Sequence, residues 1–305
     1  MNLTIINELN TLISSLLYDK PPNFSFKVNT FRKTVTIIQN LDFEIKSAEE
    51  LKNIKGIGKG TLERINEILK NGKLIENKKI VEKKNNINDF NKLQTITGIG
   101  PAKAKQLIEK NISFENLINN PTESILENLT HHQLIGVKYY HDLLKRINSS
   151  IIYDIEKYLQ KFNFTFNICG SYRRQKETSG DIDILILEEK KTLKDIVKIL
   201  TEHKFIIDNL TDDGKTKYMG ICKTPKSHAM RIDIRLIPKK SYPFALLYFT
   251  GSKKTNTYMR NIAIKAGYKL SEYGLYDKNN NSILLDTEKD IFEFLHLPYL
   301  SPDKR

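Results

Sequence analysis

Two short segments in the second half of the chain alternate branched apolar residues with charged ones. They are Asp181–Leu185 (DIDIL) and Arg231–Ile237 (RIDIRLI). Because successive side chains of a strand point to opposite faces, each segment predicts a strand with isoleucines toward a core and acids on the other face. Asp181 and Asp183 share that second face, and Asp233 has the equivalent place on the other strand. If the two strands pair, three carboxylates meet.

Three gathered carboxylates require a compensating cation or water, because like charges at close range oppose one another. Hard oxygen donors suit Mg²⁺, and two such ions can activate an attacking hydroxyl and stabilise a leaving pyrophosphate. A Gly-Ser pair precedes the acids, so Ser171 and Arg174 are candidates for binding a terminal phosphate. The pattern therefore predicts nucleotidyl transfer with two Mg²⁺ ions. The alternative is the plain polar face of an edge strand.

The first half contains an internal repeat of the pattern hydrophobic-x-Gly-Ile-Gly. One copy begins at Ile54 (IKGIGKGTLERINEIL) and the other at Ile96 (ITGIGPAKAKQLIEKN). Each copy predicts a tight hairpin followed by a helix that begins at Lys59 or Pro101. Glycines let backbone N–H groups approach a phosphate, so two copies in a basic segment favour DNA contact over a simple turn. The candidate DNA contacts here are Gly56, Gly58, Lys59, Gly98, Gly100 and Lys103.

The charge balance indicates the class of partner. The 305 residues include 49 Lys and Arg against 36 Asp and Glu, a net charge of +13, and the segment 52–110 is the strongly basic part. This excess favours nucleic acid over a membrane surface. We expect no membrane span and an intracellular protein, since no long apolar stretch or secretion signal is present. Cys169 and Cys222 lie among apolar neighbours and predict buried thiols.

The predicted secondary structure changes near Asn148. Before it, periodic apolar runs such as Thr61–Leu69 and Ala102–Ile108 predict helices. Beyond it, β-branched segments predict strands, with a helix over Thr192–Glu202 between them. The charged, Asn-rich segment 76–91 is either a linker inside the front half or a solvated helix end.

Taken together, these motifs resemble the family X DNA polymerases over nearly the whole chain. The matching stretches are GSYRR, SGDIDIL, TKYMGIC, RIDIRLIP, LLYFTGS, SEYGLY, the two hairpins and LTHHQLIGVKYYHDLLKRI. The resemblance implies an α+β multidomain fold, with an all-α helix-hairpin-helix N-terminal half, a nucleotidyltransferase-type mixed-sheet palm and a small α/β C-terminal subdomain. The implied parts are a lyase-like helical domain, a helical DNA-binding (thumb-like) segment, the palm and a nucleotide-selection subdomain, over residues 1–77, 78–148, 149–239 and 240–305.

The resemblance also implies an activity and its partners. We expect a DNA-directed DNA polymerase that fills short gaps in base excision repair, with template-independent end addition as the alternative. The implied partners are gapped or nicked DNA, deoxynucleoside triphosphates and a DNA ligase, and we expect a monomer. The implied compartment is the nucleus or, for a viral member, the cytoplasm or virion.

Roles of individual residues follow from the same resemblance. Asp181 and Asp183 would bridge both Mg²⁺ ions, and Asp233 would bind the catalytic one beside the primer 3′ hydroxyl. The implied nucleotide-binding residues are Arg146, Ser171, Arg174, Gly180, Tyr248, Phe249, Gly251 and Asn256. Further implied DNA contacts are Lys27, Arg235 and Arg260. Na⁺ or K⁺ would be bound by backbone carbonyls of Lys52, Ile54, Ile57, Gln94, Ile96 and Ile99.

Some positions depart from the family pattern. The family's lyase reaction uses a lysine Schiff base, but the matching position here is Arg64, whose guanidinium stays protonated and cannot form an imine. A tyrosine of the same pocket is replaced by Phe31. The lyase nucleophile is therefore unassigned, and we expect weak lyase activity or activity through another lysine. Lys253 and Thr257 replace an acid and a lysine near the nucleotide, which predicts reduced fidelity.

Overall fold

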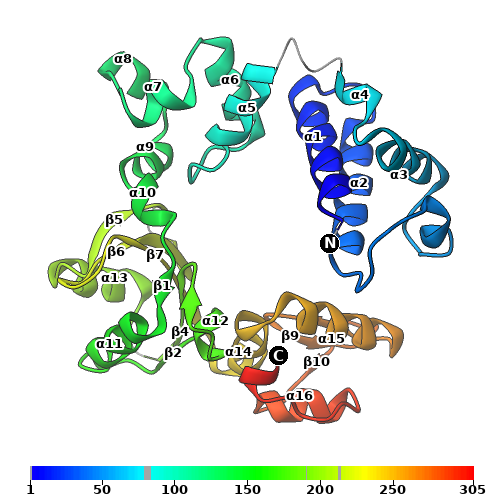
Figure 1. The fold of residues 1–305 in the computed structure, drawn as a ribbon. Coiled ribbons are helices and arrows are strands. Elements are labelled where there is room, and N and C mark those ends of the chain that lie inside the picture. Colours follow the sequence, from blue (N-terminus) through cyan, green and yellow to red (C-terminus); the bar gives the residue numbers. More distant parts are fainter. Residues whose placement is uncertain (1, 79–83, 190, 212–213) are drawn as a thin grey trace. The chain divides into compact units, whose positions relative to one another are not determined.

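The computed structural model describes residues 2–78, 84–189, 191–211 and 214–305. The chain divides into two compact units, Met1–Val137 (the front unit) and Lys138–Arg305 (the back unit). Figure 1 shows helices throughout the front unit and a sheet within the back unit, as the fold prediction requires. Among the described helices, none combines the length and the apolar composition needed to cross a bilayer.

The front unit is built from helices that bury one apolar face each. In chain order they are α1 (Leu3–Asp19), α2 (Phe24–Gln39), the 3₁₀ turn η1 (Ala48–Leu51), α3 (Lys59–Asn71), α4 (Ile75–Lys78), α5 (Lys84–Leu93), α6 (Pro101–Glu109), α7 (Phe114–Ile118), α8 (Glu123–Leu126) and α9 (His131–Lys138). A core of residues such as Leu9, Phe31 and Ile65 holds α1, α2 and α3 together. The predicted all-α front half is confirmed.

Both predicted hairpins lead directly into helices. Helix α3 begins at Lys59 and α6 begins at Pro101, as the repeat predicts. Gly56 has φ +106° and Gly98 has φ +85°, a left-handed conformation that residues with a side chain rarely adopt. The first of the two glycines in each repeat is therefore required by the turn itself.

The second hairpin is also clamped by α9. A Cβ atom on Gly98 would lie 3.0 Å from the His132 ring, and the Gln133 side-chain amide donates to the Gly98 carbonyl at 3.1 Å. On α9, Gly136 lies against the hairpin so closely that a Cβ there would be 2.0 Å from the Thr97 carbonyl oxygen. Close backbone packing thus fixes this hairpin on its supporting helix.

The segment 76–91 is mostly helical where the structure describes it, and residues 79–83 lie outside the described residues. Helix α5 covers its second part because Ile87 and Phe90 fall on one face, together with Leu93, and are buried. The linker alternative is therefore wrong for residues 84–91. Within α5, the polar residues Asn86 and Asn88 are exposed, opposite the buried face.

The palm of the back unit is a five-stranded mixed sheet in the order β2-β4-β7-β6-β5 among the described residues. Its strands are β2 (Phe166–Ile168), β4 (Ile182–Leu187), β5 (Ile206–Asn209), β6 (Lys217–Cys222) and β7 (Met230–Ile237). Strands β4 and β7 are parallel, and the other neighbours pair antiparallel. Helices α11 (Ser149–Leu159) and α13 (Leu193–Glu202) lie against this sheet (Figure 1).

In β4 and β7, the isoleucines and the acidic residues lie on opposite faces of the sheet, as predicted. Ile182, Ile184, Ile232 and Ile234 are buried in the core beneath α11 and α13. On the other face Leu185 is covered by α14 (Tyr242–Thr250). The acidic residues lie on this second face, before the part that α14 covers. Burial on both sides explains the apolar run after Asp183, which is typical of parallel strands.

The remaining elements complete the back unit. They are α10 (Tyr140–Leu143), β1 (Ile147–Asn148), α12 (Gly170–Arg173), β3 (Thr178–Ser179), η3 (Lys239–Ser241), α15 (Lys253–Lys265), β8 (Lys269–Ser271), β9 (Gly274–Tyr276), β10 (Ser282–Ile283), α16 (Glu288–Phe294) and η4 (Pro302–Lys304). Residues 138–148 belong to this unit, since Lys138 and Tyr139 both donate to Asp208 at 2.7 Å. Cys169 and Cys222 are buried free thiols, as predicted.

A buried ion network ties the C-terminal subdomain to the palm. Glu288 accepts from Arg173 of α12 at 2.6 and 3.0 Å, and from the terminal residue Arg305 at 2.5 Å. Glu288 is 7% exposed, so these charges are nearly removed from water and depend on each other. Arg173 also donates to Thr250 at the end of α14. The network therefore fixes the segment between α14 and α16 against the palm.

Candidate active site

The three predicted carboxylates meet at one edge of the palm. The parallel pairing of β4 with β7 places Asp183 directly beside Asp233, and Asp181 precedes β4 on the same face. Ligand oxygens of all three residues lie within 4.8 Å of one another. The prediction that distant stretches bring these aspartates together is confirmed.

A glycine makes room for the central carboxylate. Gly170, which begins α12, has φ +60°, and a Cβ there would lie 2.7 Å from Asp183 Oδ2. The chain before it is fixed by a hydrogen bond from the Cys169 N–H to the Asp183 carbonyl at 2.8 Å. The Gly-Ser turn is thereby held beside the aspartates, which explains why glycine precedes Ser171 in the motif.

The environment disfavours negative charge on these residues. Burial raises the pKa of Asp183 to about 7, with further increases from the neighbouring charges of Asp181 and Asp233. Burial also raises the pKa of Asp233, against the lowering effect of the nearby Arg231 guanidinium. Crowded carboxylates that are costly to ionise are a feature of sites where a cation supplies the missing positive charge.

Arg231 partly compensates the acids. Its guanidinium forms an ion pair with Asp181, and its Nε lies 3.4 Å from Asp233 Oδ1. No role was predicted for Arg231 from the sequence. The alternation R-x-D-x-R was the available signal, because residues two apart on a strand share a face.

The residues present fit a divalent cation. Asp233 Oδ1 is buried and has no hydrogen-bond partner among the described residues, since the contact with Arg231 lacks hydrogen-bond geometry. Three carboxylates supply hard oxygen donors, which suit a hard divalent ion, whereas softer ions prefer nitrogen or sulfur donors. The donor set, and a buried Asp233 oxygen that accepts no hydrogen bond from a described residue, therefore both favour a divalent metal at the triad.

A cleft of about 710 Å³ opens next to the triad. It is lined by Asp181 and Asp183 and by every residue predicted to bind the nucleotide: Arg146, Ser171, Arg174, Gly180, Tyr248, Phe249, Gly251 and Asn256. Lys253, Thr257 and Arg260 line it as well. The structure thus brings together residues that are scattered over more than a hundred positions of the sequence, although their individual roles stay predictions.

The basic side chains of the cleft are positioned by backbone carbonyls. Arg146 donates to the Thr178 carbonyl at 2.7 Å and packs 3.4 Å from the Cβ position of Gly180. Arg174 donates to the Thr250 carbonyl at 2.5 Å, while its buried Nε has no partner among the described residues. Two oriented guanidinium groups near clustered aspartates are suited to binding a phosphate chain.

Aromatic residues form the wall contributed by α14. Asn256 donates to the Tyr248 carbonyl at 2.7 Å, which fixes its amide at the start of α15. The guanidinium of Arg260 lies 5.5 Å from the Tyr248 ring centroid, and that of Arg235 lies 5.2 Å from the Phe249 centroid. The contact with Tyr248 holds Arg260 at the cleft wall, whereas Arg235 packs on Phe249 and does not itself line the cleft.

The predicted DNA contacts of the front unit differ in their surroundings. Lys27 and Lys59 are exposed. Lys103 instead donates to the Asn128 carbonyl and to Gln106 at 3.0 Å. Burial, followed by the charge of Lys110, lowers the pKa of Lys103. Lys103 therefore ties α6 to the segment after α8, in addition to any contact with DNA.

The proposed cation-binding carbonyls form the turns of the two hairpins. The Ile54 carbonyl accepts from the Ile57 N–H at 3.2 Å, and the Ile96 carbonyl accepts from the Ile99 N–H at 3.0 Å. The matching bonds show that the repeat has one geometry. Each carbonyl oxygen retains a second lone pair, so a monovalent ion is compatible with this turn.

Arg64, at the position where an amine nucleophile was expected, is fully engaged. It forms a paired ion contact with Glu76 at 2.6 and 3.3 Å and donates to the Gly60 carbonyl at 2.8 Å. Its guanidinium lies 5.4 Å from the Phe31 ring centroid. Arg64 therefore contributes to packing between α2, α3 and α4.

A helical front half with paired hairpins, followed by a mixed-sheet palm with clustered aspartates, defines a protein of the nucleotidyltransferase class. Family models agree in detail. They match a helix-hairpin-helix domain (residues 2–74), the fingers domain of DNA polymerase lambda (91–144), the DNA polymerase beta palm (143–239) and the DNA polymerase beta thumb (245–305). The chain belongs to the family X DNA polymerases. These models apply the name thumb to the C-terminal subdomain and fingers to the segment termed thumb-like above.

Curated relatives point to the same family. The chain is 33% identical to DNA polymerase lambda of Arabidopsis thaliana over 90% of its length, and 29% identical to that of Rattus norvegicus, also over 90%. It is 26% identical to DNA nucleotidylexotransferase of Xenopus laevis over 99% of its length. The chain spans 57%, 52% and 69% of these three relatives, in that order.

Proposed function

We propose that this protein is a DNA-directed DNA polymerase that fills short gaps during base excision repair. The observation that carries the proposal is the single cleft in which two of the three clustered aspartates and all eight predicted nucleotide-binding residues lie together. A triphosphate needs both cations and donors along its length, and this cleft supplies both kinds of site. The DNA polymerases among its relatives support the same reaction.

The side chains divide the work of nucleotidyl transfer. Asp181, Asp183 and Asp233 would hold two Mg²⁺ ions, which supply Lewis acidity at the reacting phosphate when bound. Arg174 and the Ser171 hydroxyl, which donates to Ser179 at 2.8 Å in this structure, would orient the triphosphate. Asp233, which the pairing of β4 with β7 places beside Asp183, would accept the proton from a primer 3′ hydroxyl. The contacts of Arg231 with Asp181 and Asp233 would break when bound cations supply the positive charge instead.

The front unit would bind the DNA backbone. Each hairpin presents glycine backbone next to the start of a helix, a geometry that suits phosphate groups without reading bases. We propose that Na⁺ or K⁺ at the hairpin carbonyls strengthens this contact. Acting as a monomer on gapped or nicked DNA inside the cell, the enzyme would leave a nick for a DNA ligase.

The choice of DNA substrate tests the proposal. Wild-type protein is incubated with Mg²⁺ and deoxynucleoside triphosphates on a one-nucleotide gap and, separately, on a single-stranded primer. We expect templated insertion in the gap that exceeds addition to the single strand by at least about a hundredfold. Equal, untemplated addition to both substrates would favour the terminal-transferase alternative, in line with the nucleotidylexotransferase relative. Absence of both activities would contradict the proposal.

We further infer that lyase activity is weak or uses a displaced lysine. Arg64 is held by Glu76 and cannot supply a neutral amine. Lys55, Lys59 and Lys73 are the nearby candidates in the sequence. Borohydride trapping on a 5′-incised abasic site, followed by peptide mapping, identifies the amine. A strong adduct would overturn the inference of weak activity, and a complete absence of adduct would exclude a relocated nucleophile.

A further inference from the structure

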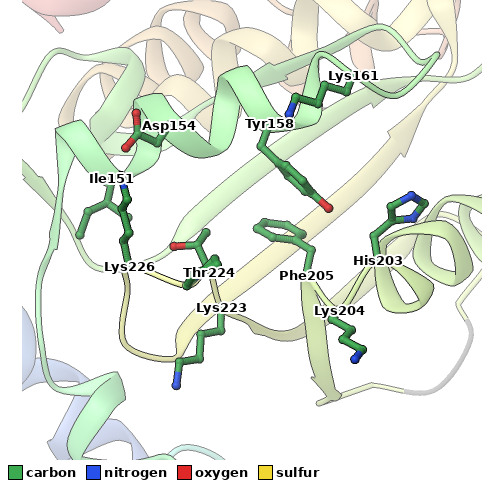
Figure 2. Close-up of a pocket in the computed structure, with 11 residues that line it drawn as sticks. Ile151, Asp154, Tyr158, Lys161, His203, Lys204, Phe205, Lys223, Thr224 and Lys226 are labelled. Carbon is green, nitrogen blue, oxygen red and sulfur yellow. The ribbon is translucent and has the colours of Figure 1, made fainter.

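A second pocket lies in the palm and shares no residue with the active-site cleft. Its volume is about 640 Å³, and Figure 2 shows it between α11, the end of α13, the start of β5 and the turn after β6. Its apolar part is formed by Ile151, Tyr158 and Phe205. Residues of this group pack into the core on the α11 side of the sheet, and the aspartates lie on the opposite face. The pocket is thus separate from the catalytic chemistry.

The aromatic floor of the pocket is held rigidly. The Tyr158 ring packs against Phe205 with centroids 5.5 Å apart and edge-on against Phe162 at 5.4 Å. Opposite it, the turn that begins at Thr224 is closed by a hydrogen bond from the Thr224 N–H to Ser227 Oγ at 2.9 Å. A fixed floor and a fixed rim favour binding, since little ordering entropy is lost when a ligand enters.

Polar groups around this floor are available to a ligand. Within the described residues, the Tyr158 hydroxyl and the Asp154 carboxylate have no hydrogen-bond or ion-pair partner. His203 uses Nδ1 in a contact with the Ile199 carbonyl at 2.8 Å, which leaves its other ring nitrogen available. An apolar pocket with a few convergent polar groups is the usual form of a binding site.

Positive charge dominates the rim. Lys161, Lys204, Lys223 and Lys226 line the pocket against the single carboxylate of Asp154. None of the four lysines forms an ion pair with a described residue. The pocket is therefore complementary to a ligand with a flat apolar part, anionic groups and at least one hydrogen-bond donor for Asp154.

We propose that this pocket binds one nucleotide of a single-stranded segment of DNA. A base can lie against the partly exposed Tyr158 ring, which the buried Phe205 supports, and donate an N–H to Asp154. Lys161, whose Nζ lies 5.8 Å from the Tyr158 ring centroid, and the other rim lysines can bind the phosphates. An acidic peptide fits less well, because its carboxylate side chains only accept hydrogen bonds and cannot donate one to Asp154. Figure 2 shows Lys223 and Lys226 on one side of the floor, and Lys161 and Lys204 on the other. A nucleotide within a strand has a phosphate on each side, whereas a free nucleotide has one anionic end.

Photo-crosslinking of the full chain tests this assignment. A short single-stranded oligonucleotide that contains 5-iododeoxyuridine is bound, irradiated and mapped by peptide analysis. We expect an adduct on α11 at or next to Tyr158. The double variant Lys223→Glu/Lys226→Glu should lower its yield about tenfold, because two phosphate-binding charges are reversed. Tyr158→Leu should abolish it. The matched control Lys239→Glu/Lys240→Glu changes the same number of exposed lysines outside both pockets and should leave the yield unchanged.

Each remaining outcome overturns the proposal. Adducts confined to the front unit or to the active-site cleft would exclude a strand at this pocket. An equal loss in the control double variant would reduce the effect to overall charge. Competition by free 5-iododeoxyuridine monophosphate at equal concentration would assign the pocket to mononucleotides. Displacement of the oligonucleotide by a peptide of glutamate and phenylalanine, dependent on the same lysines, would assign it to an acidic protein partner.

Discussion

Two charged sites, one in each unit, differ in how completely neighbouring groups compensate their charge. In the front unit, Arg64 is satisfied by Glu76 at 2.6 Å and by a backbone carbonyl. In the back unit, Asp183 and Asp233 lie side by side, burial raises the pKa of both, and one oxygen of Asp233 has no hydrogen-bond partner among the described residues. A satisfied charge stabilises the fold, whereas a crowded one is stable only with an added cation. The difference indicates where the chemistry takes place.

The largest effect should come from removing one of the crowded acids. Asp233→Ala should lower single-turnover gap filling by at least about a thousandfold, because metal binding and proton acceptance are both lost. Asp286→Ala, which removes an exposed carboxylate of the same unit, is the matched control and should retain full rate. A rate for Asp233→Ala within tenfold of wild type would place the chemistry elsewhere.

The next effect concerns a satisfied charge in the back unit. Glu288→Ala should lower the free energy of unfolding by about 3 to 5 kcal/mol, since it leaves the buried Arg305 and the partly buried Arg173 without their carboxylate partner. Denaturant unfolding measures this change. Glu293→Ala, which removes an exposed pair with Lys289, should cost about 1 kcal/mol or less. Equal costs for both variants would show that burial of the Glu288 network is energetically unimportant.

Removing the charge of a crowded acid should instead make the metal-free protein more stable. The folded-state pKa of Asp183 is raised from 3.8 to about 7, so the metal-free protein loses stability as pH rises from about 4 to 7. In the presence of a chelator, Asp183→Asn should therefore raise the unfolding temperature at pH 8 by on the order of 5 °C, and by nearly nothing at pH 4. A lower unfolding temperature at pH 8 would mean that the carboxylate is stabilising.

The smallest effect should be at Arg64. Its pair with Glu76 is partly exposed, so Arg64→Ala should cost about 1 kcal/mol or less by denaturant unfolding. Arg64→Lys should increase borohydride-trapped adduct on incised abasic DNA several-fold, because it supplies an amine at this position. Arg64→Gln, which has no amine, is the control for the trapping assay. If Arg64→Lys gives no more adduct than Arg64→Gln, the position has lost its access to the sugar.

The sequence predicted those features that depend on local periodicity. Alternation in β4 and β7 predicted which faces Asp181, Asp183 and Asp233 occupy, and the glycine repeat predicted that helices begin at Lys59 and Pro101. The strand face on which a residue lies and the position of a tight turn can be predicted from the sequence, because both depend on residues that are neighbours in the chain. The resemblance to the polymerase family supplied the residues that were then found around one cleft.

The sequence did not reveal contacts that form only after the chain folds. The Arg173–Glu288 pair joins residues 115 positions apart, and no local pattern marks either member. Helix α5 was hard to predict because the segment 76–91 is charged and rich in Asn, although Ile87 and Phe90 have helical spacing. The ion pair between Arg231 and Asp181 required the neighbouring positions of β4 and β7, and their parallel pairing is a tertiary property.

Counting bound Mn²⁺ by electron paramagnetic resonance tests the central claim most directly. The wild-type chain is saturated with gapped DNA and a non-hydrolysable nucleotide, and free Mn²⁺ is measured during titration. The gathered aspartates predict two tightly bound ions per complex, and Asp183→Asn should lose at least one of them, while Asp286→Ala should retain both. Equal Mn²⁺ binding by wild type and Asp183→Asn would contradict the account.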